Sequence, residues 1–451
     1  MRLTTLRPAA LLLAALLTAG CEDSAVPNLT NPSLDDITTN PTRAQVQSLA
    51  TGLIIGNRAA LGVQVLDLEI LGRDAYNLDA ADPRWVDEML GGTLDPGGFG
   101  SRNWDLYYQN IKGANVMIEG VATAEALSTE EKSAATGYAR TMKALDLLYV
   151  LEARDSAGIA IDAGASTGEL APIACREPAL TRIAALLDSA QTDLAAGGAT
   201  FPFALTSGFA GFDTPATFTT FNRGIKARAE IYRSKTDPAA FGLALDALNA
   251  SFVDTTASLD RGVYHVYSLS AGDAVNPLFQ DPATSNYRAH PSVADDAEPG
   301  DLRVAAKTEL GDAKTYQGVG SNIVFTRYAS PTAPLPIIRN EELVLLRAQA
   351  NLGLGNLLAA QRDINTIRVK SGGLAPRVYA STAAALDDLL AQKRYSLLFE
   401  SGSRWVDARL YGRLDTLPLD IPADHVVHPN FAIPRDEANA RSSTGVVTCT
   451  P

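Results

Sequence analysis

Apolar residues recur at helical spacing along most of the chain. Over 104–122 they return every three or four positions, which places them on one face of a predicted helix. Capping-box patterns at Thr42 and Ser128 mark the starts of two more helices, and the first of these is expected to run to about Ile55. Further helical stretches are predicted at 182–195, 219–232, 239–253, 342–353, 357–369 and 386–400.

Long stretches rich in turn residues separate these helices. Residues 79–100 contain Pro83, Pro96 and several glycines, and residues 254–335 form a larger loop-rich insertion with strand-like patches such as 263–269 and 323–328. Loops of this length inside a compact domain are usually functional. The pattern therefore predicts a mainly α fold of helix pairs with long loop-rich insertions and few short strands.

Two of the predicted helices form a hairpin. Gly355 and Asn356 supply a tight turn between 342–353 and 357–369. Small residues stand where two antiparallel helices would press together: Ala348, Ala350, Ala359 and Ala360. Small residues at the crossing, a glycine turn and a unit of about 34 residues indicate a tetratricopeptide-type repeat.

The first 21 residues have the layout of a lipoprotein signal peptide. A short positive stretch precedes the apolar run 8–17, which is too short to span a bilayer core of about 30 Å, and small residues lead directly to Cys21. The alternative is an ordinary cleaved signal in which Cys21 has no role. We expect a signal peptide over 1–20, lipidation of Cys21 and an extended tether over 21–41.

Composition narrows the class of protein further. A formal net charge of −13 disfavours nucleic acid and anionic membrane surfaces as partners, and an apolar content of 46% is that of a globular protein. Apart from Cys21, only Cys175 and Cys449 remain. An exported protein sits where disulfides persist, so this pair is chemically allowed, although the sequence leaves open whether the two come within reach. No motif predicts a cofactor or a metal site.

Several segments, in order along the chain, resemble the SusD/RagB family of nutrient-uptake lipoproteins. Residues 394–409, which read RYSLLFESGSRWVDAR, are the most specific of them. The others are the Trp104–Asn115 helix, the 336–368 repeat and the 432–439 segment. The resemblance spans nearly all of the mature chain and implies one SusD-like helical domain over 42–451.

The resemblance also implies a function. It predicts a lipid-anchored protein of the outer membrane, facing the exterior, that binds oligosaccharides or peptides and passes them to a SusC-like TonB-dependent transporter. Such a protein is not an enzyme and has no catalytic residues. Two alternatives remain open, a surface glycosidase and a repeat scaffold that binds only proteins.

The charged run 394–409 has two interpretations. Glu400 and Asp407 could form an acid/base pair, or they could be structural partners of arginines such as Arg394, Arg404, Arg409 and Arg347. Because buried charges must be paired, and because no histidine or nucleophile joins them, we favour the structural interpretation. On this view the run locks the last helices onto the repeat.

The loop before the Trp104 helix is the expected ligand site, because the family binds ligands through loops. Its aromatic, amide and carboxylate residues suit sugars, since a flat ring covers the apolar face of a pyranose while polar groups bond its hydroxyls. The candidates are Trp85 as stacking platform, with Asp74, Tyr76, Asn77 and, from the insertion, Tyr287; Tyr264 and Tyr267 are weaker candidates for a facing wall. The alternative is that Trp85 merely plugs its own loop onto the body.

Overall fold

A computed structural model describes residues 37–164, 170–441 and 449. The signal peptide, Cys21 and most of the tether therefore lie outside the described residues. Within these ranges helices dominate and the strands are few and short, which confirms the expected fold class.

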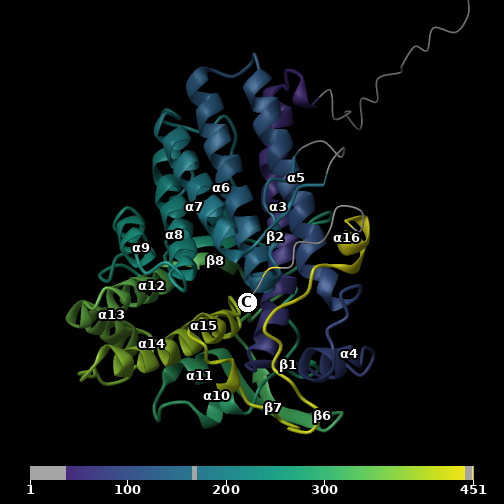
Figure 1. Cartoon of the computed structure of the whole chain (residues 1–451), viewed down its shortest axis with the longest axis vertical. Helices are drawn as coiled ribbons and strands as arrows, with labels where there is room; N and C mark the ends of the chain where they lie inside the picture. The colour runs from purple at the N-terminus through teal and green to yellow at the C-terminus, as the bar shows by residue number, and fades with distance from the viewer. Residues whose placement is uncertain (1–36, 165–169, 442–448, 450–451) are drawn as a thin grey trace, which may run out of the picture.

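Five long helices form the N-terminal half of the body. They are α3 (Arg43–Leu71), α5 (Phe99–Thr123), α6 (Thr129–Arg154), α7 (Arg176–Ala195) and α8 (Pro215–Arg233). Each packs against the next along the chain, and Figure 1 shows them side by side in the upper part of the molecule. The capping boxes predicted at Thr42 and Ser128 are present and start α3 and α6.

Helix α3 runs well past the end expected at Ile55. From Ala60 to Leu71 almost every side chain is buried, including the polar Gln64, Asp67 and Glu69, so this part is buried on all sides and lacks the one-sided spacing that marks a surface helix. By length and composition α3 could cross a membrane, but 56% of its most apolar window is buried inside the protein. Because α3 packs against α5, it is a core helix of this body.

Helix pairs resume after the insertion. Helix α9 (Ala240–Asn249) precedes the insertion, and α12 (Asn340–Gly353), α13 (Leu357–Lys370), α14 (Thr382–Ser396) and α15 (Ser403–Leu410) follow it. The predicted hairpin is α12 and α13, and Gly355 at its turn has a φ of 77°, a conformation that favours glycine. Of the four alanines expected at the crossing, Ala348 and Ala360 are buried in one apolar cluster between α12, α13 and α14. Ala350 is buried in the main core instead, and Ala359 is half-buried.

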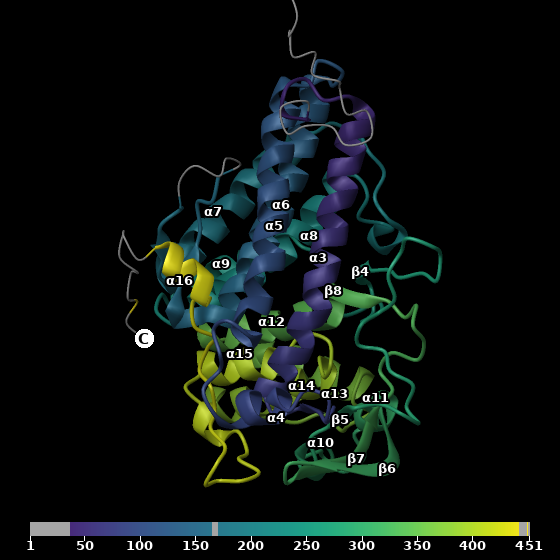
Figure 2. The ribbon, with the colours of Figure 1, turned by 90° about the vertical axis from the view of Figure 1, so that its right-hand side faces the viewer.

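The strands form one small sheet and two pairs. The sheet is antiparallel, in the order β1 (Ala75–Asn77), β5 (Tyr287–Ala289), β7 (Val319–Phe325) and β6 (Thr308–Tyr316). The pairs are β2 (Ile159–Ala160) with β3 (Ile173–Ala174), and β4 (Gly262–His265) with β8 (Leu335–Arg339). Figure 2 shows the sheet at the lower end of the molecule, below the lower end of α3.

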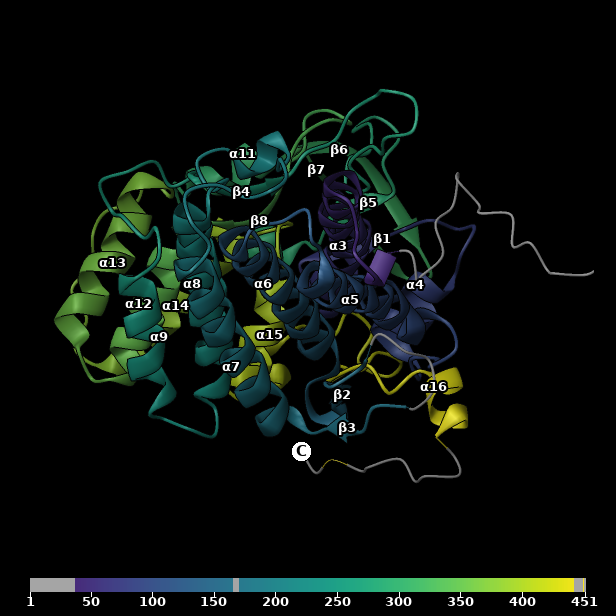
Figure 3. The same cartoon turned by 90° about the horizontal axis from the view of Figure 1, so that it is seen from above.

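Short helical turns complete the connections. These are α4 (Arg84–Val86), η1 (Asp87–Gly91), η2 (Asp155–Ala157), η3 (Ser207–Phe209), α10 (Ser292–Asp295), α11 (Leu302–Lys307), η4 (Leu414–Thr416) and α16 (Arg435–Ala440). Residues 79–100, expected as a loop, thus contain α4 and η1, and α5 begins at their end. Figure 3, seen from above, places α4 and α16 at one side of the body and α13 at the other.

The run 394–409 is structural, but its partners differ from those expected. Glu400 binds Lys307, Arg327 and Arg339, with nitrogen–oxygen distances of 2.7–2.8 Å. Burial alone would raise the pKa of Glu400, but these three cations hold it well below its usual range. The arginines named from the sequence contact other groups, because the nearest carboxylates in space come from distant segments.

Those other groups extend the same network. Arg394 and Arg404 each bind the Asp74 carboxylate at 2.8 Å, and Asp407 binds Lys393 at 2.8 Å. We call Asp74, Glu400, Asp407 and the cations that bind them the charged hub. It joins α14 and α15 to the segment after α3 and to the strands of the insertion.

A disulfide joins Cys175, at the start of α7, to Cys449. Their Cα atoms are 5.4 Å apart, within bridging reach, and 274 positions separate them in the sequence. The pairing that the sequence left open is therefore present in the structure.

Candidate functional site

The segment after α3 is pinned to the body by Arg73. This residue has a φ of 57° and is fully buried, and its guanidinium donates to the backbone carbonyls of Leu90 at 3.1 Å and Val426 at 2.6 Å. Asp74 and β1 follow directly. The loop beyond them, residues 78–98, therefore leaves the body from a fixed point.

Trp85 on that loop packs against the first turn of α5. Its ring centroid lies 4.5 Å from that of the buried Phe99, at an interplanar angle of 59°. The guanidinium carbon of Arg102 lies 4.8 Å from the Trp85 centroid and 4.9 Å from that of Phe99. Trp85 is half-buried, so part of its surface faces solvent while a cation and a second ring hold it in place.

Arg102 in turn approaches a buried acid on α3. Its Nη1 lies 3.4 Å from Oδ1 of Asp67, whose other carboxylate oxygen accepts a hydrogen bond of 2.9 Å from Asn103. Burial raises the pKa of Asp67 to about 6, against the opposing charge of Arg102. The guanidinium is thus held between a buried carboxylate and two aromatic rings, with 31% of its side chain exposed.

Sheet pairing brings the insertion to the same place. Tyr287 on β5 stands opposite Asn77 on β1, and both residues flank the loop that carries Trp85. Burial raises the pKa of Tyr287 and the charge of Arg102 opposes it, so the phenol lies within electrostatic reach of that guanidinium. We call Asn77, Trp85, Phe99, Arg102 and Tyr287 the loop cluster.

Three of the five candidates from the sequence thus lie in or beside one cluster, and two do not. Asp74 is buried and binds Arg394 and Arg404, so it has a structural role in place of the expected ligand contact. Tyr76 is also buried, and its hydroxyl donates to Asp420 at 2.8 Å. Both were chosen as neighbours of the loop, and burial was not visible in their sequence.

The weaker candidates lie in other parts of the molecule. Tyr264 is on β4, where it lines a wide groove with Gly208 and Phe212, and its hydroxyl donates to the backbone of Asp260. Tyr267 is buried, with Arg58 5.4 Å from its ring centroid. Neither belongs to the loop cluster.

Phe99 and Arg102 were missed by the sequence reasoning. Their spacing of three residues at the start of a helix is the signal that could have found them, because such residues share a face. Asp67 had no comparable signal, since it stands in a mostly apolar stretch that also contains Gln64 and Glu69.

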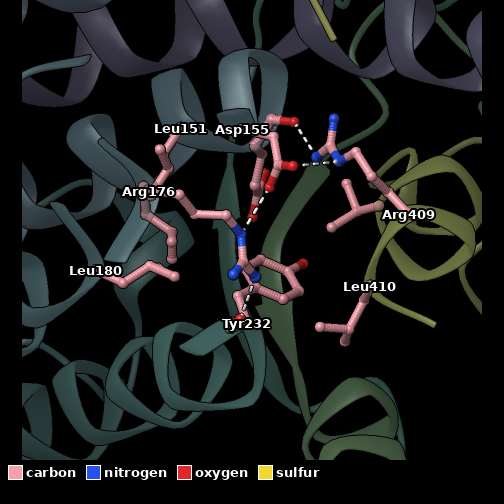
Figure 4. Close-up of a pocket in the computed structure, with 10 residues that line it drawn as sticks. Leu151, Asp155, Arg176, Leu180, Tyr232, Arg409 and Leu410 are labelled. Carbon is pink, nitrogen blue, oxygen red and sulfur yellow. Dashed lines mark hydrogen bonds and ion pairs between the residues drawn. The ribbon is translucent and has the colours of Figure 1, made fainter. Parts of the chain in front are cut away.

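A separate small pocket lies between α6, α7, α8 and α15 (Figure 4). Asp155 points between Arg176, at 2.7 Å, and Arg409, at 3.8 Å, while Leu151, Leu180 and Leu410 line the walls. Its volume of about 20 Å³ is close to the 10–15 Å³ that one water requires. This pocket is an ion-pair contact that ties α15 to the N-terminal helices, and it is too small for an organic ligand.

The arrangement of helices is similar to that of known structures. A SusD superfamily protein from Parabacteroides distasonis superposes with a TM-score of 0.67 at 14% identity, over 89% of this chain and 98% of that one. The chain has the SusD-like fold.

Other structures with the SusD-like fold match over similar lengths. Surface glycan-binding protein A from Bacteroides thetaiotaomicron gives a TM-score of 0.67 at 13% identity, over 91% of this chain and 99% of that one. A structure with a xylogluco-oligosaccharide gives 0.61 at 19% identity, over 82% of each chain. The sequence itself matches no protein-family model and no curated protein.

Proposed function

We propose that this protein is a surface-exposed lipoprotein of the outer membrane that binds glycans and passes them to a TonB-dependent transporter. The observation that carries the proposal is the loop cluster, in which Trp85 and Arg102 are held at the surface of a SusD-like fold. Two of the similar structures are a surface glycan-binding protein and a structure with an oligosaccharide, which supports a glycan as the ligand.

The loop cluster offers what a sugar needs. The exposed part of the Trp85 ring can cover the apolar face of a pyranose, and Arg102 can donate hydrogen bonds to ring or hydroxyl oxygens. Phe99 and Asp67 fix these two side chains from behind, so little side-chain freedom remains to be lost on binding. The half-buried Tyr287 on β5 can supply a further hydroxyl, whereas Asn77 is buried and its side-chain oxygen accepts the N–H of Asp79 at 3.2 Å.

Calorimetry with a panel of soluble glycans, beginning with xyloglucan oligosaccharides, tests the proposal. Trp85→Ala should weaken binding by about 1–3 kcal/mol, the scale of one stacking contact and its buried area, and should change thermal stability little. Tyr264→Ala is the matched control, because it removes a half-buried aromatic from a different groove. Unchanged affinity of Trp85→Ala for a confirmed glycan would exclude the loop cluster as the platform. A clearly lowered melting temperature of that variant would show that Trp85 holds its own loop on the body.

The anchor and the transporter are tested in the native membrane. Cys21→Ser should prevent acylation and release the protein from the membrane fraction. Purification of the wild-type protein from outer membranes should bring a large β-barrel with it. A Cys21→Ser variant that still partitions into detergent like the wild type would contradict the anchor.

A further inference from the structure

The guanidinium of Arg102 has hydrogen-bonding capacity that the protein does not use. It makes no hydrogen bond to any described residue, and its charged contact is the 3.4 Å approach of Nη1 to Asp67. None of its three nitrogens is sealed from solvent, and 31% of the side chain is exposed. A guanidinium carries five N–H donors in one plane, so Arg102 can bind an acceptor that arrives from solvent.

The two rings beside Arg102 leave these donors free. The guanidinium carbon lies 4.8 Å from the Trp85 centroid and 4.9 Å from the Phe99 centroid. Such contacts join the charge of the cation to the faces of the rings, so they hold the guanidinium without an oxygen acceptor. A carboxylate matches what is left, because its two oxygens accept two parallel N–H groups of one guanidinium.

The acids nearest to Trp85 are only partly available to a ligand. Both oxygens of Asp82 are bound by Arg84 at 2.8 Å. Asp79 lies within electrostatic reach of Tyr287, and one of its carboxylate oxygens accepts a backbone N–H at 3.0 Å while the other has no hydrogen bond to a described residue. The free groups are therefore the donors of Arg102 and one acceptor on Asp79. A ligand with a carboxylate and hydroxyl groups satisfies both, and an acidic sugar has this composition.

The remaining acids of the loop act on the other arginine. Glu88 and Asp95 lie within electrostatic reach of Arg84, and Asp95 also pairs with the exposed Arg435. They therefore do not occupy the donors of Arg102.

We propose that the loop cluster binds a sugar that carries a carboxylate, and that Arg102 exchanges its long contact with Asp67 for paired hydrogen bonds to that carboxylate. The exposed part of the Trp85 ring covers the sugar, and Asp79 accepts one of its hydroxyls. This inference rests on the proposed function and names the class of glycan.

Binding of the acid changes the charge around Asp67. Burial raises the pKa of Asp67 to about 6, and the strongest opposition comes from the charge of Arg102. The other polar and charged groups that act on Asp67, or on which it acts, are Asn103 and Tyr107 of α5, Arg154 of α6 and Tyr287 of β5.

A second carboxylate on Arg102 makes the ionised form of Asp67 less favourable. The ligand offsets the cation and adds a negative charge nearby, so the pKa of Asp67 rises further and the protein takes up a proton from solvent. Linkage then requires that the affinity for the acid falls as the pH rises above about 6.

Calorimetry of the mature protein with matched acids and esters tests the class of sugar. Tri-galacturonate and a xylo-oligosaccharide that carries glucuronic acid are each compared at pH 6 with their methyl esters, which keep the sugar and lose the charge. At least one acid should bind at least about tenfold more tightly than its ester. Its affinity should fall at least about fivefold from pH 6 to pH 8, and titrations in two buffers of different ionisation enthalpy should show net proton uptake.

The outcomes separate this inference from the proposed function. Equal affinity of acid and ester overturns the inference, and if Trp85→Ala weakens both ligands the glycan function stands. Failure of both acids to bind at concentrations up to about 10 mM also overturns the inference. The neutral glycans then decide the proposed function by themselves. Absence of proton uptake excludes the exchange at Asp67.

Variants distinguish Arg102 from a general effect of charge. Arg102→Gln should bring the affinities of acid and ester to within about twofold of each other. Lys112→Gln, the matched control, removes a cation further along α5 and should keep the wild-type preference. Asp67→Asn removes the titrating acid, so the acidic sugar should bind with nearly the same affinity at pH 6 and pH 8. A wild-type preference in Arg102→Gln, or a wild-type pH profile in Asp67→Asn, overturns the proposal.

Discussion

The charged hub and the loop cluster both place arginines beside aromatic rings, yet they differ in what the arginines contact. In the hub, Arg339 is 4% exposed and binds Glu400 and Glu341. Arg327, which also binds Glu400, lies with its guanidinium carbon 5.2 Å from the centroid of the Tyr328 ring. In the loop cluster, Arg102 keeps 31% of its side chain exposed and approaches its acid at only 3.4 Å. All three nitrogens of the Arg339 guanidinium are bonded within the protein, and it holds the fold, whereas Arg102 at the surface keeps donors available to a ligand.

Two aspartates seven positions apart show the same difference. Asp74 in the hub accepts hydrogen bonds from two arginines. Oδ1 of Asp67, beneath the loop cluster, has no hydrogen-bond partner among the described residues, only the longer contact with Arg102. Both are buried, so burial alone does not distinguish a structural acid from an acid beneath a candidate site. The two acids differ in the number of hydrogen-bond donors that surround them.

Breaking the hub should have the largest effect on stability. Glu400→Ala leaves Lys307, Arg327 and Arg339 without their shared carboxylate, and the free energy of unfolding should fall by about 3–5 kcal/mol, as for other broken buried pairs. Urea denaturation measures this. Asp82→Asn on the loop side is the control, because it removes an exposed carboxylate paired with Arg84 and should change stability little. Equal losses in both variants would remove the distinction between the two regions.

The free energy of unfolding should depend on pH through Glu69, a second buried acid near the C-terminal end of α3. It accepts the backbone N–H groups of Phe399 and Gly402 at 3.0 Å, and burial, then the charge of Asp74, raises its pKa to about 8. The folded state keeps the Glu69 proton to a higher pH than the unfolded state does. The contribution of Glu69 to the free energy of unfolding is therefore fully present below about pH 4.5. It is lost as the pH rises to about 8, by up to about 1.4 kcal/mol per pH unit.

Glu69→Gln isolates that contribution. The amide oxygen can still accept both N–H groups but does not titrate, so stability should fall less between pH 5 and 8 than in the wild type. Other acids with raised pKa values, including Asp146 and Glu152, remain in both proteins, so the difference between the two denaturation series is the quantity to measure. Glu119→Gln, on the exposed face of α5, should keep the wild-type slope. An unchanged slope in Glu69→Gln would contradict the raised pKa.

The smallest stability change is expected on the loop side. Arg102→Gln removes the cation beside Trp85 and Phe99, worth about 0.5–1 kcal/mol at an exposed position, and should reduce glycan affinity more than it reduces the melting temperature. It should also raise the pKa of Asp67 further, because Arg102 is the main charge that opposes burial there. Arg84 pairs with Asp82 and lies 5.1 Å from the Phe99 ring centroid but does not act on Asp67, so Arg84→Gln should leave that pKa unchanged.

Local features of the fold could be predicted from the sequence, and distant contacts could not. The caps at Thr42 and Ser128 and the turn at Gly355 depend on a few adjacent residues, and the structure contains all three. The structural role of Glu400 was also predictable from the number of charges around it. Its partners were not, because Lys307, Arg327 and Arg339 come from the insertion and the strand after it.

The role of the loop cluster as a ligand site stays a prediction, and the sequence indicated only some of its residues. Trp85 and Tyr287 were chosen for their residue types. Sheet pairing, which no local pattern encodes, places Tyr287 opposite Asn77, and Arg102 lies against Trp85 and within electrostatic reach of Tyr287. Asp74 was misassigned because the arginines that cover it lie 320 and 330 positions away. Arg102 was overlooked because its role depends on the loop folding back over it.

Helix α3 determines the directions in which two buried acids point, one toward the loop cluster and one toward the charged hub. It starts at the cap of Thr42, and at its far end Asp67 faces the loop cluster while Glu69 faces the hub. One residue inserted after Gly52, where the surroundings leave open space, would turn everything beyond it by about 100° and advance it by about 1.5 Å. Both acids would then point away from their partners at once. Surface loops in general tolerate changes in length, whereas the spacing between Thr42 and Glu69 is a fixed dimension of this molecule.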